Sequence, residues 1–349
     1  MKAKLLLLAT LAVLFNACIS NDRTLPAVTG SQFELLIVVN DTAWNSEVGK
    51  ELFRIFAQET PSLPQPEPLM DVKQCNHVEF SDLLKPSRNI LMVDISNKYT
   101  TTKIRYSKDR WAYPQTVVRI TAPDDSTLLK SLKQYELPLQ DYFIASERDR
   151  QIRFYKDYIN AKAQGEIEKQ FGIIVNVPQG ISKSVQKKDF YWITNDQAGV
   201  RQDIIVYSYP YTDKKMFSKE ALIAKRDSIL KANIPGELKG SFMGTETKYA
   251  DPEFREIWVN KAYCAELRGL WKMFNGASMG GPFYSHSRLD EVNQRIVTVE
   301  GFVFAPGKKK RNPMRQLEAV VYTTRLPHEI NALNEVVVEA KKVNADSVK

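Results

Sequence analysis

The feature that most constrains the fold is the alternation of strand-like and helix-like segments over residues 33–122. Residues 33–39 form an apolar run interrupted only by Glu34, as in a strand that is buried on both faces. Residues 43–60 repeat apolar side chains at helical spacing, and four prolines at positions 61–68 then impose an extended connector. Further strands are predicted at 69–74, 89–95 and 115–121, with a short helix at 78–85. This alternation predicts an α/β domain.

A helical region follows this domain. Asp124 and Asp125 stand where the positive end of a helix dipole favours acidic residues. The helical pattern is interrupted at residues 137–138 and resumes to residue 159. Positive and negative charges interleave over 147–169, which favours the solvated face of a linking helix over a membrane-binding or nucleic-acid-binding helix. We place the domain boundary near residues 165–172.

The second half of the chain is dominated by strand patterns. Ser218 is the expected N-cap of a helix over 219–232. Strands are predicted at 171–177, 190–194, 203–209, 241–249, 255–260, 295–304 and 316–325. The predicted fold class is therefore α+β, with an N-terminal α/β domain and a mainly antiparallel C-terminal α+β domain. The order of elements at the start of this half resembles Mog1/PsbP-like domains in architecture only, which implies no functional residues.

The amino terminus predicts export from the cytoplasm. Lys2 and Lys4 precede an apolar run over residues 5–15, which is shorter than the roughly 20 residues that a helix needs to cross a bilayer. Phe15-Asn16-Ala17-Cys18 resembles the bacterial lipobox, with Leu14 one position further out than usual. The resemblance implies cleavage after Ala17 and acylation of Cys18, and several acyl chains would make a durable membrane anchor. An ordinary signal peptide with a coincidental cysteine is the alternative.

These patterns divide the chain into five parts. Residues 1–17 are the predicted signal peptide, 18–31 the tether, 32–165 the N-terminal domain with its linking helix, 166–330 the C-terminal domain and 331–349 a polar tail. Only one acidic residue, Asp22, closely follows Cys18. An acidic cluster there would favour surface display, so we expect the protein on the periplasmic side of the outer membrane.

Composition excludes several functions. The formal charge is +8, and removal of Lys2 and Lys4 lowers it to +6, so charge does not argue for nucleic acid as a partner. Cys75 and Cys264 are expected to be buried thiols, although a disulfide between them stays open. Cys75 and His77 are too few ligands for zinc, and no nucleotide-binding glycine motif is present. We therefore predict neither a metal nor a cofactor.

Residues 278–290 are the segment most suggestive of a site. Paired glycines allow close approach of a ligand or another chain, and they precede aromatic, hydroxyl, imidazole and guanidinium groups. We predict a loop that contributes to a ligand or partner surface through Gly280, Gly281, Phe283, Tyr284, Ser285, His286 and Arg288. A catalytic triad is disfavoured, because neighbouring side chains in an extended segment point to opposite faces. The competing interpretation places Phe283 in the core and leaves the glycines to shape a turn.

A second candidate surface is the basic run Lys308, Lys309, Lys310 and Arg311. It lies between two predicted strands and is interpreted as a hairpin tip. Four consecutive positive charges can hold an anionic polymer, which would make the tip a weak electrostatic accessory. A solvated loop whose charges discourage edge-to-edge association is favoured over that role.

Together, the lipobox, "LLIVVND", "MGGPFYSHSRLDE" and "VEGFVFAPGKKKRNPMRQLEAVVYT" resemble a Bacteroidota family of envelope lipoproteins known only as a domain of unknown function. The resemblance covers essentially the whole mature chain and implies location but no catalytic residues. The leading hypothesis is a membrane-anchored, non-catalytic protein that binds an envelope protein or an anionic polymer. The alternative is a periplasmic hydrolase acting on glycan or ester substrates. A concave site where His286 meets an acid from another strand would favour the hydrolase.

Overall fold

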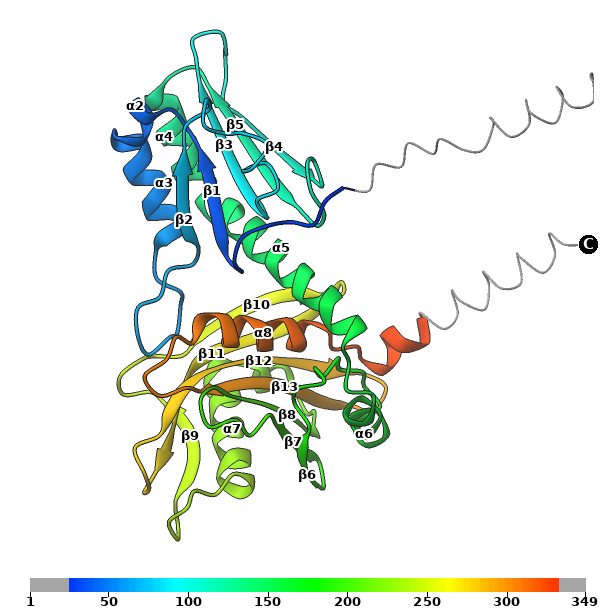
Figure 1. The fold of residues 1–349 in the computed structure, drawn as a ribbon. Helices are drawn as coiled ribbons and strands as arrows, with labels where there is room; N and C mark the ends of the chain where they lie inside the picture. Colours follow the sequence, from blue (N-terminus) through cyan, green and yellow to red (C-terminus); the bar gives the residue numbers. More distant parts are fainter. Residues whose placement is uncertain (1–24, 333–349) are drawn as a thin grey trace, which may run out of the picture.

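The computed structural model describes residues 25–332, and these residues form two β-sheets with helices packed on them (Figure 1). Cys18, the signal peptide and most of the predicted tether and tail lie outside the described residues. Within the described part, no helix combines the length and the apolar character that crossing a membrane requires.

The N-terminal sheet has five strands in the order β2-β1-β3-β5-β4. Four of them are parallel, and β4 pairs with β5 in the antiparallel sense at one edge. Strand β4 was not predicted, because its alternation is weak and most of its side chains are exposed. The strands are β1 (Glu34–Val38), β2 (Asp71–Cys75), β3 (Asn89–Ile95), β4 (Lys103–Lys108) and β5 (Thr116–Ala122).

Helices cover one face of this sheet and bury its apolar side chains. The predicted helix over 43–60 is divided, because the Ser46 side chain accepts a hydrogen bond from the Val48 N–H and starts a new helix. The predicted helix over 78–85 is absent. The Asn76 side chain instead accepts from the N–H groups of Val78 and Glu79 and holds a turn. The helices are α2 (Asp41–Trp44), α3 (Glu47–Ala57), α4 (Asp125–Gln134) and α5 (Glu136–Asp157).

The C-terminal sheet is fully antiparallel, in the order β10-β11-β12-β13-β8-β7-β6, with β9 pairing to β11. The predicted fold class, an α/β region followed by a mainly antiparallel α+β region, is confirmed. The strands are β6 (Lys183–Lys187), β7 (Phe190–Thr194), β8 (Arg201–Pro210), β9 (Phe242–Glu246), β10 (Glu253–Val259), β11 (Ala262–Phe274), β12 (Gly280–Asp290) and β13 (Arg295–Phe304).

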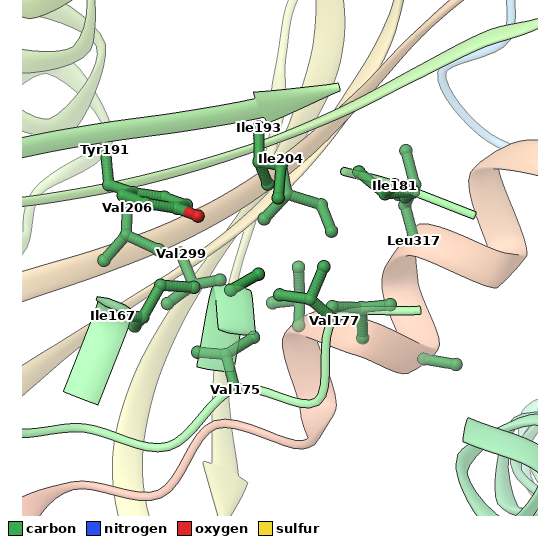
Figure 2. Close-up of a cluster of buried hydrophobic side chains, with 14 of the residues drawn as sticks. Ile167, Val175, Val177, Ile181, Tyr191, Ile193, Ile204, Val206, Val299 and Leu317 are labelled. Carbon is green, nitrogen blue, oxygen red and sulfur yellow. The ribbon is translucent and has the colours of Figure 1, made fainter. Parts of the chain in front are cut away.

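Both faces of this sheet are covered. On one face, α6 (Ala161–Phe171) and α8 (Arg311–Tyr322) pack on the sheet, and Figure 2 shows Ile167 and Leu317 among the buried side chains of this core. The short helix η1 (Lys214–Phe217) and α7 (Lys219–Asn233) cover the other face. Ser218 caps α7 by accepting from the Ala221 N–H, as its sequence position indicates.

Two predicted strands have other conformations. Residues 316–325 lie mostly in α8, where Leu317, Val320 and Val321 face the sheet. An apolar run of this length suits a strand or a buried helix, and packing decides between them. Residues 171–177 leave α6 and pair only at isolated bridges, such as the one between Ile174 and Arg325.

Helix α5 contributes to both cores. Its first half places Leu139 and Phe143 against the N-terminal sheet, and Tyr155 near its end packs with the C-terminal core. Gly165, at one end of the predicted boundary, lies inside α6, whose Ala163 and Ile167 belong to the C-terminal core. The division into two domains at that point stays a prediction.

Candidate functional site

The predicted loop over residues 278–290 is in fact a buried strand. Strand β12 pairs with β11 on one side and β13 on the other, so it lies inside the sheet. Phe283, Tyr284, Ser285, His286 and Arg288 are all buried. Phe283 therefore lies in the core, as the competing interpretation expects. These side chains are buried because helices cover both faces of the sheet. The hydrogen-bond partners of the polar ones come from other parts of the chain.

The paired glycines have a packing role. A Cβ atom on Gly281 would lie 2.0 Å from the carbonyl oxygen of Val303, and one on Gly280 would lie 2.7 Å from that of Trp271. Strands β11 and β13 therefore approach too closely for a side chain at these positions. The close approach that the sequence indicates is made by neighbouring strands of the same sheet, and not by a ligand.

Arg288 is an anchor between β12 and the end of the described chain. Its guanidinium forms hydrogen bonds to both carboxylate oxygens of Glu329, at 2.7 and 3.1 Å. It also donates to the carbonyl oxygens of Val259 and Thr324. The hydrogen bond from Arg288 lowers the pKa of Glu329 against the opposing effect of burial. Its Nε–H has no partner among the described residues, but both terminal nitrogens of Arg288 are bonded inside the protein and the residue is fully buried, so it is not available to an external ligand.

The predicted basic hairpin tip is the start of helix α8, and half of its charge is used internally. Glu67, from the proline-rich connector, accepts from the backbone N–H groups of Lys310 and Arg311, at 2.6 and 3.1 Å. The Arg311 guanidinium binds Asp71 at 2.6 Å. Lys310 and Arg311 are buried, whereas Lys308 and Lys309 are exposed. The tip therefore joins the connector to α8 (Figure 1), and only two of its charges face solvent.

Tyr284 and His286 form a buried network with an acid from another strand. The Tyr284 hydroxyl donates to Glu266 of β11 at 2.5 Å, and its oxygen lies 2.8 Å from His286 Nε2. Because tyrosine has one proton to give, His286 Nε2 is the donor in the second contact. The Nδ1 atom of His286 is buried and has no hydrogen-bond partner among the described residues. The imidazole is therefore neutral, with its proton on Nε2.

The electrostatics of this network oppose protonation of His286. Burial lowers the pKa of His286 to about 3, and the nearby positive charges of Arg288, Arg148 and Arg268 act in the same direction. Burial also raises the pKa of Tyr284, assisted by the negative charge of Glu266. Both side chains are thus held neutral at physiological pH.

Next to this network lies a cleft between the two sheets, which we call the interdomain cleft after the predicted division of the chain. Its volume is ≈ 340 Å³. The N-terminal part contributes the connector and one side of α5, and the C-terminal part contributes β10, β11 and α8. Its lining residues include Glu59, Asp141 and Arg255 at exposed positions, and Arg148, Glu266, Arg268, Arg315, Glu318 and Tyr322 deeper inside.

The deep part of the cleft holds alternating charges. Arg268 forms an ion pair with Glu266 at 3.1 Å and another with Glu318 at 3.6 Å, and Arg315 binds Glu318 at 2.8 Å. The Arg148 guanidinium stacks on the ring of Tyr322 at 3.7 Å. Burial opposes the charge of Arg268, but Glu318 and Glu266 together raise its pKa. The cleft thus has three arginines and two carboxylates at its base.

Donors outnumber acceptors in this arrangement. The Nε–H groups of Arg268 and Arg315 are buried and have no partner among the described residues. The Arg148 guanidinium makes no hydrogen bond within residues 25–332 and is held by stacking. Unpaired buried donors are costly, and each one in a native protein calls for a partner such as a water or a ligand. The base of the cleft is therefore suited to an added acceptor, above all a carboxylate.

Sequence reasoning missed this cleft, although it contains local signals. Glu266 and Arg268 are two residues apart in a strand, and Arg315 and Glu318 are three apart in a helix, so each pair shares one face. Their convergence depends on the packing of α8 over β12 and β13, which brings Glu318 to Arg268 of the neighbouring strand β11. Of the segments proposed from sequence, β12 lies beneath the cleft through Tyr284, and the basic tip does not line it.

A larger groove of ≈ 580 Å³ lies near η1 and β10, but it is mainly apolar. Tyr211, Phe217, Phe254 and Tyr263 line it, with Lys214, Glu256, Glu291 and His328. Its lining residues include no buried charged side chain with an unpartnered hydrogen-bond donor. We therefore regard the interdomain cleft as the better candidate site.

The cysteines and possible metal ligands offer no further site. Cys75 and Cys264 are buried free thiols, and burial raises the pKa of both. Within residues 25–332, His, Cys, Asp and Glu side chains do not gather in a group that could hold a metal ion.

The buried neutral His286 predicts a specific pH dependence of stability. Its pKa is about 3 in the folded protein and 6.5 ordinarily, so between these values the unfolded chain binds a proton that the folded protein does not. The free energy of unfolding should therefore be constant above pH 6.5 and fall below it. Between pH 7 and pH 5 the loss should be about 2 kcal/mol larger than in a His286→Gln variant. Urea unfolding at both pH values measures it, and equal losses in the two proteins would contradict the assignment.

Comparison with known proteins gives two matches to family models, both described as domains of unknown function. Residues 28–156 match DUF8532 and residues 160–323 match DUF4837. No curated protein matches the chain. Among solved structures, the chain is similar to the Ran-binding protein Mog1p of Saccharomyces cerevisiae, with 13% identity over 44% of this chain and 90% of that chain. The TM-score is 0.27, which is too low to support any argument. The chain thus consists of two regions that each match a domain of unknown function.

Proposed function

We propose that this protein is a lipid-anchored, non-catalytic binding protein of the cell envelope, and that the interdomain cleft receives a carboxylate group of an envelope protein or polymer. The observation that carries the proposal is the pair of unpartnered Nε–H groups of Arg268 and Arg315 at the base of the cleft. Interfaces between domains are common places for ligand sites, and guanidinium groups bind carboxylates in a fixed geometry.

The charges of the cleft favour a single carboxylate over a densely charged polymer segment. Three arginines and two carboxylates at the base leave one positive charge in excess. Glu59 and Asp141 near the opening would repel further negative charge, and Arg255 offsets one of them. An acidic side chain or a chain terminus of a partner satisfies these conditions.

Binding is favoured over hydrolysis because the acid–base groups are poorly placed for catalysis. His286 meets Glu266 from another strand, as the hydrolase hypothesis requires, but His286 does not line the cleft and its low pKa makes it a weak base. Glu266 and Glu318 are both held in ion pairs with arginines, so neither carboxylate is free to approach a substrate.

Titration with two isosteric probes tests the proposed site. N-acetyl-glutamate methylamide carries one side-chain carboxylate, and N-acetyl-glutamine methylamide carries a neutral amide of the same shape. A charge-assisted hydrogen bond should make the carboxylate probe bind at least about tenfold more tightly to the mature protein. Calorimetry at low ionic strength measures both affinities. Equal affinities, or no binding of either probe, would contradict the proposal.

The lipid anchor rests on the lipobox resemblance around Cys18 and has its own test. Cys18→Ala should release the protein from the membrane fraction or leave an uncleaved precursor, because the acylated sulfur is lost. Fractionation of cells and the mass of the mature protein report the result, with Cys75→Ala as the matched control. Normal processing and unchanged membrane retention of the Cys18 variant would refute the anchor. Protease treatment of intact cells tests the periplasmic orientation.

A further inference from the structure

A second pocket lies on the other face of the C-terminal sheet, against the region that follows α7. Its volume is ≈ 280 Å³, and it shares no lining residue with the interdomain cleft. Most of its wall is apolar and aromatic. The wall includes Trp192, Ile234, Met243, Trp271, Phe302 and Phe304.

Two carboxylates also line this pocket, that of Glu237 at an exposed position and that of Asp203 inside. Asp203 lies on β8 and is fully buried. The Trp192 indole N–H donates to its Oδ1 atom at 2.9 Å, and the Arg201 guanidinium donates to the same oxygen at 3.0 and 3.1 Å. All these donors use Oδ1.

The second oxygen of Asp203 has no donor among the described residues. Burial raises the pKa of Asp203, whereas Arg201, Trp192 and the hydroxyl of its cross-strand neighbour Thr194 lower it. The Thr194 hydroxyl also accepts from the Asp196 N–H, and it does not reach Oδ2 in hydrogen-bond geometry. A buried acceptor without a well-placed donor is costly, so a ligand that brings a donor into this pocket would gain from meeting Oδ2.

The charges inside the pocket are already balanced, whereas the Glu237 carboxylate lies at an exposed position of the wall. Arg201 forms an ion pair with Asp203 at 3.0 Å, and its guanidinium lies over the Trp192 ring at 5.4 Å. A cationic ligand would meet the charge of Arg201, and an anionic ligand would meet Asp203. Asp203 Oδ2 therefore calls for an uncharged hydrogen-bond donor.

We propose that this pocket binds a small neutral molecule that combines a ring-sized apolar body with one hydroxyl or amide N–H, which donates to Asp203 Oδ2. A cavity of about 150 Å³ lined by apolar side chains already accepts benzene, so ≈ 280 Å³ accommodates a ring with a short polar substituent. This site is independent of the interdomain cleft and of the function proposed for it.

Three probes of nearly equal size test the proposal: benzyl alcohol, toluene and benzoate. Binding to the mature protein is followed through the NMR resonance of the Trp192 indole N–H, which donates to the same carboxylate. Benzyl alcohol should bind about tenfold more tightly than toluene, because its hydroxyl meets a charged acceptor. Benzoate should bind more weakly than toluene.

Two variants complete the test. Asp203→Asn should reduce the preference for benzyl alcohol over toluene to less than about threefold, since the free anionic acceptor is lost. Ala277→Trp places a large side chain at an exposed position of the pocket wall, away from Asp203. It should weaken the binding of all three probes. If Asp203→Asn fails to fold, the three probes and the Ala277→Trp variant still test whether the pocket binds a neutral donor. Equal binding of benzyl alcohol and toluene, or shifts that Ala277→Trp leaves unchanged, would overturn the proposal.

Discussion

Replacing Glu300 by alanine should lower the free energy of unfolding by about 3–5 kcal/mol, the largest single effect that we expect on stability. Glu300 of β13 is fully buried and accepts two hydrogen bonds from Arg226 of α7, at 2.7 and 2.8 Å. Arg226 also stacks on Phe283 at 3.6 Å and donates to Thr245. Alanine at position 300 would leave the buried guanidinium with only the longer ion pair to Asp227, at 3.9 Å.

The matched controls separate the ion pair from its surroundings. A double variant, Arg226→Met with Glu300→Leu, removes both charges and should be closer in stability to the wild type than Glu300→Ala is. Glu47→Ala breaks an exposed pair with Lys50 and should have little measurable effect. Urea unfolding measures all three. A Glu300→Ala protein within about 1 kcal/mol of the wild type would contradict the importance of this pair.

The second large effect concerns binding in the interdomain cleft. Arg148→Ala should lower the affinity for the carboxylate probe N-acetyl-glutamate methylamide by about tenfold or more, because a charge-assisted hydrogen bond is lost. Arg148 is held by stacking on Tyr322 and makes no hydrogen bond among the described residues, so its removal should change the melting temperature little. Calorimetric titration and thermal melting measure the two quantities.

Arg153→Ala is the matched control for this experiment. Arg153 is on the same helix, α5, but is exposed and does not line the cleft; it donates to the Tyr113 hydroxyl at 2.9 Å. Both variants remove one positive charge, so long-range electrostatics change equally. Arg153→Ala should retain the affinity of the wild type. An equal loss of affinity for the carboxylate probe in both variants would mean that net charge, and not the cleft, governs binding.

Much of the fold could be predicted from the sequence wherever a local pattern matched the local structure. The apolar run at β1, the apolar and aromatic runs at β7 and β8, and the Ser218 cap of α7 all indicated the right element. Strand β12 was missed because Tyr284, His286 and Arg288 are polar at buried positions. Their partners, Glu266 and Glu329, come from distant parts of the sequence, so no local pattern shows that these side chains are satisfied.

The start of α8 shows the same limit. Lys308–Arg311 was interpreted as a solvated tip because four positive charges are rarely buried together. Glu67 and Asp71, more than 200 residues earlier in the chain, compensate Lys310 and Arg311. The cleft itself depends on α8 packing over β12 and β13 and joining the connector at its start, an arrangement that only tertiary packing determines.

The most direct test of the central claim observes the two unpartnered guanidinium donors themselves. Nitrogen-15 NMR of arginine Nε–H groups can follow Arg268, Arg315 and, as an internal control, Arg226, whose Nε–H is already bonded to Glu300 on the other face of the sheet. On titration with N-acetyl-glutamate methylamide, we predict saturable shifts of the Arg268 and Arg315 resonances with no shift of Arg226. Unmoved resonances of Arg268 and Arg315, or equal shifts of all three, would contradict a carboxylate site in the interdomain cleft.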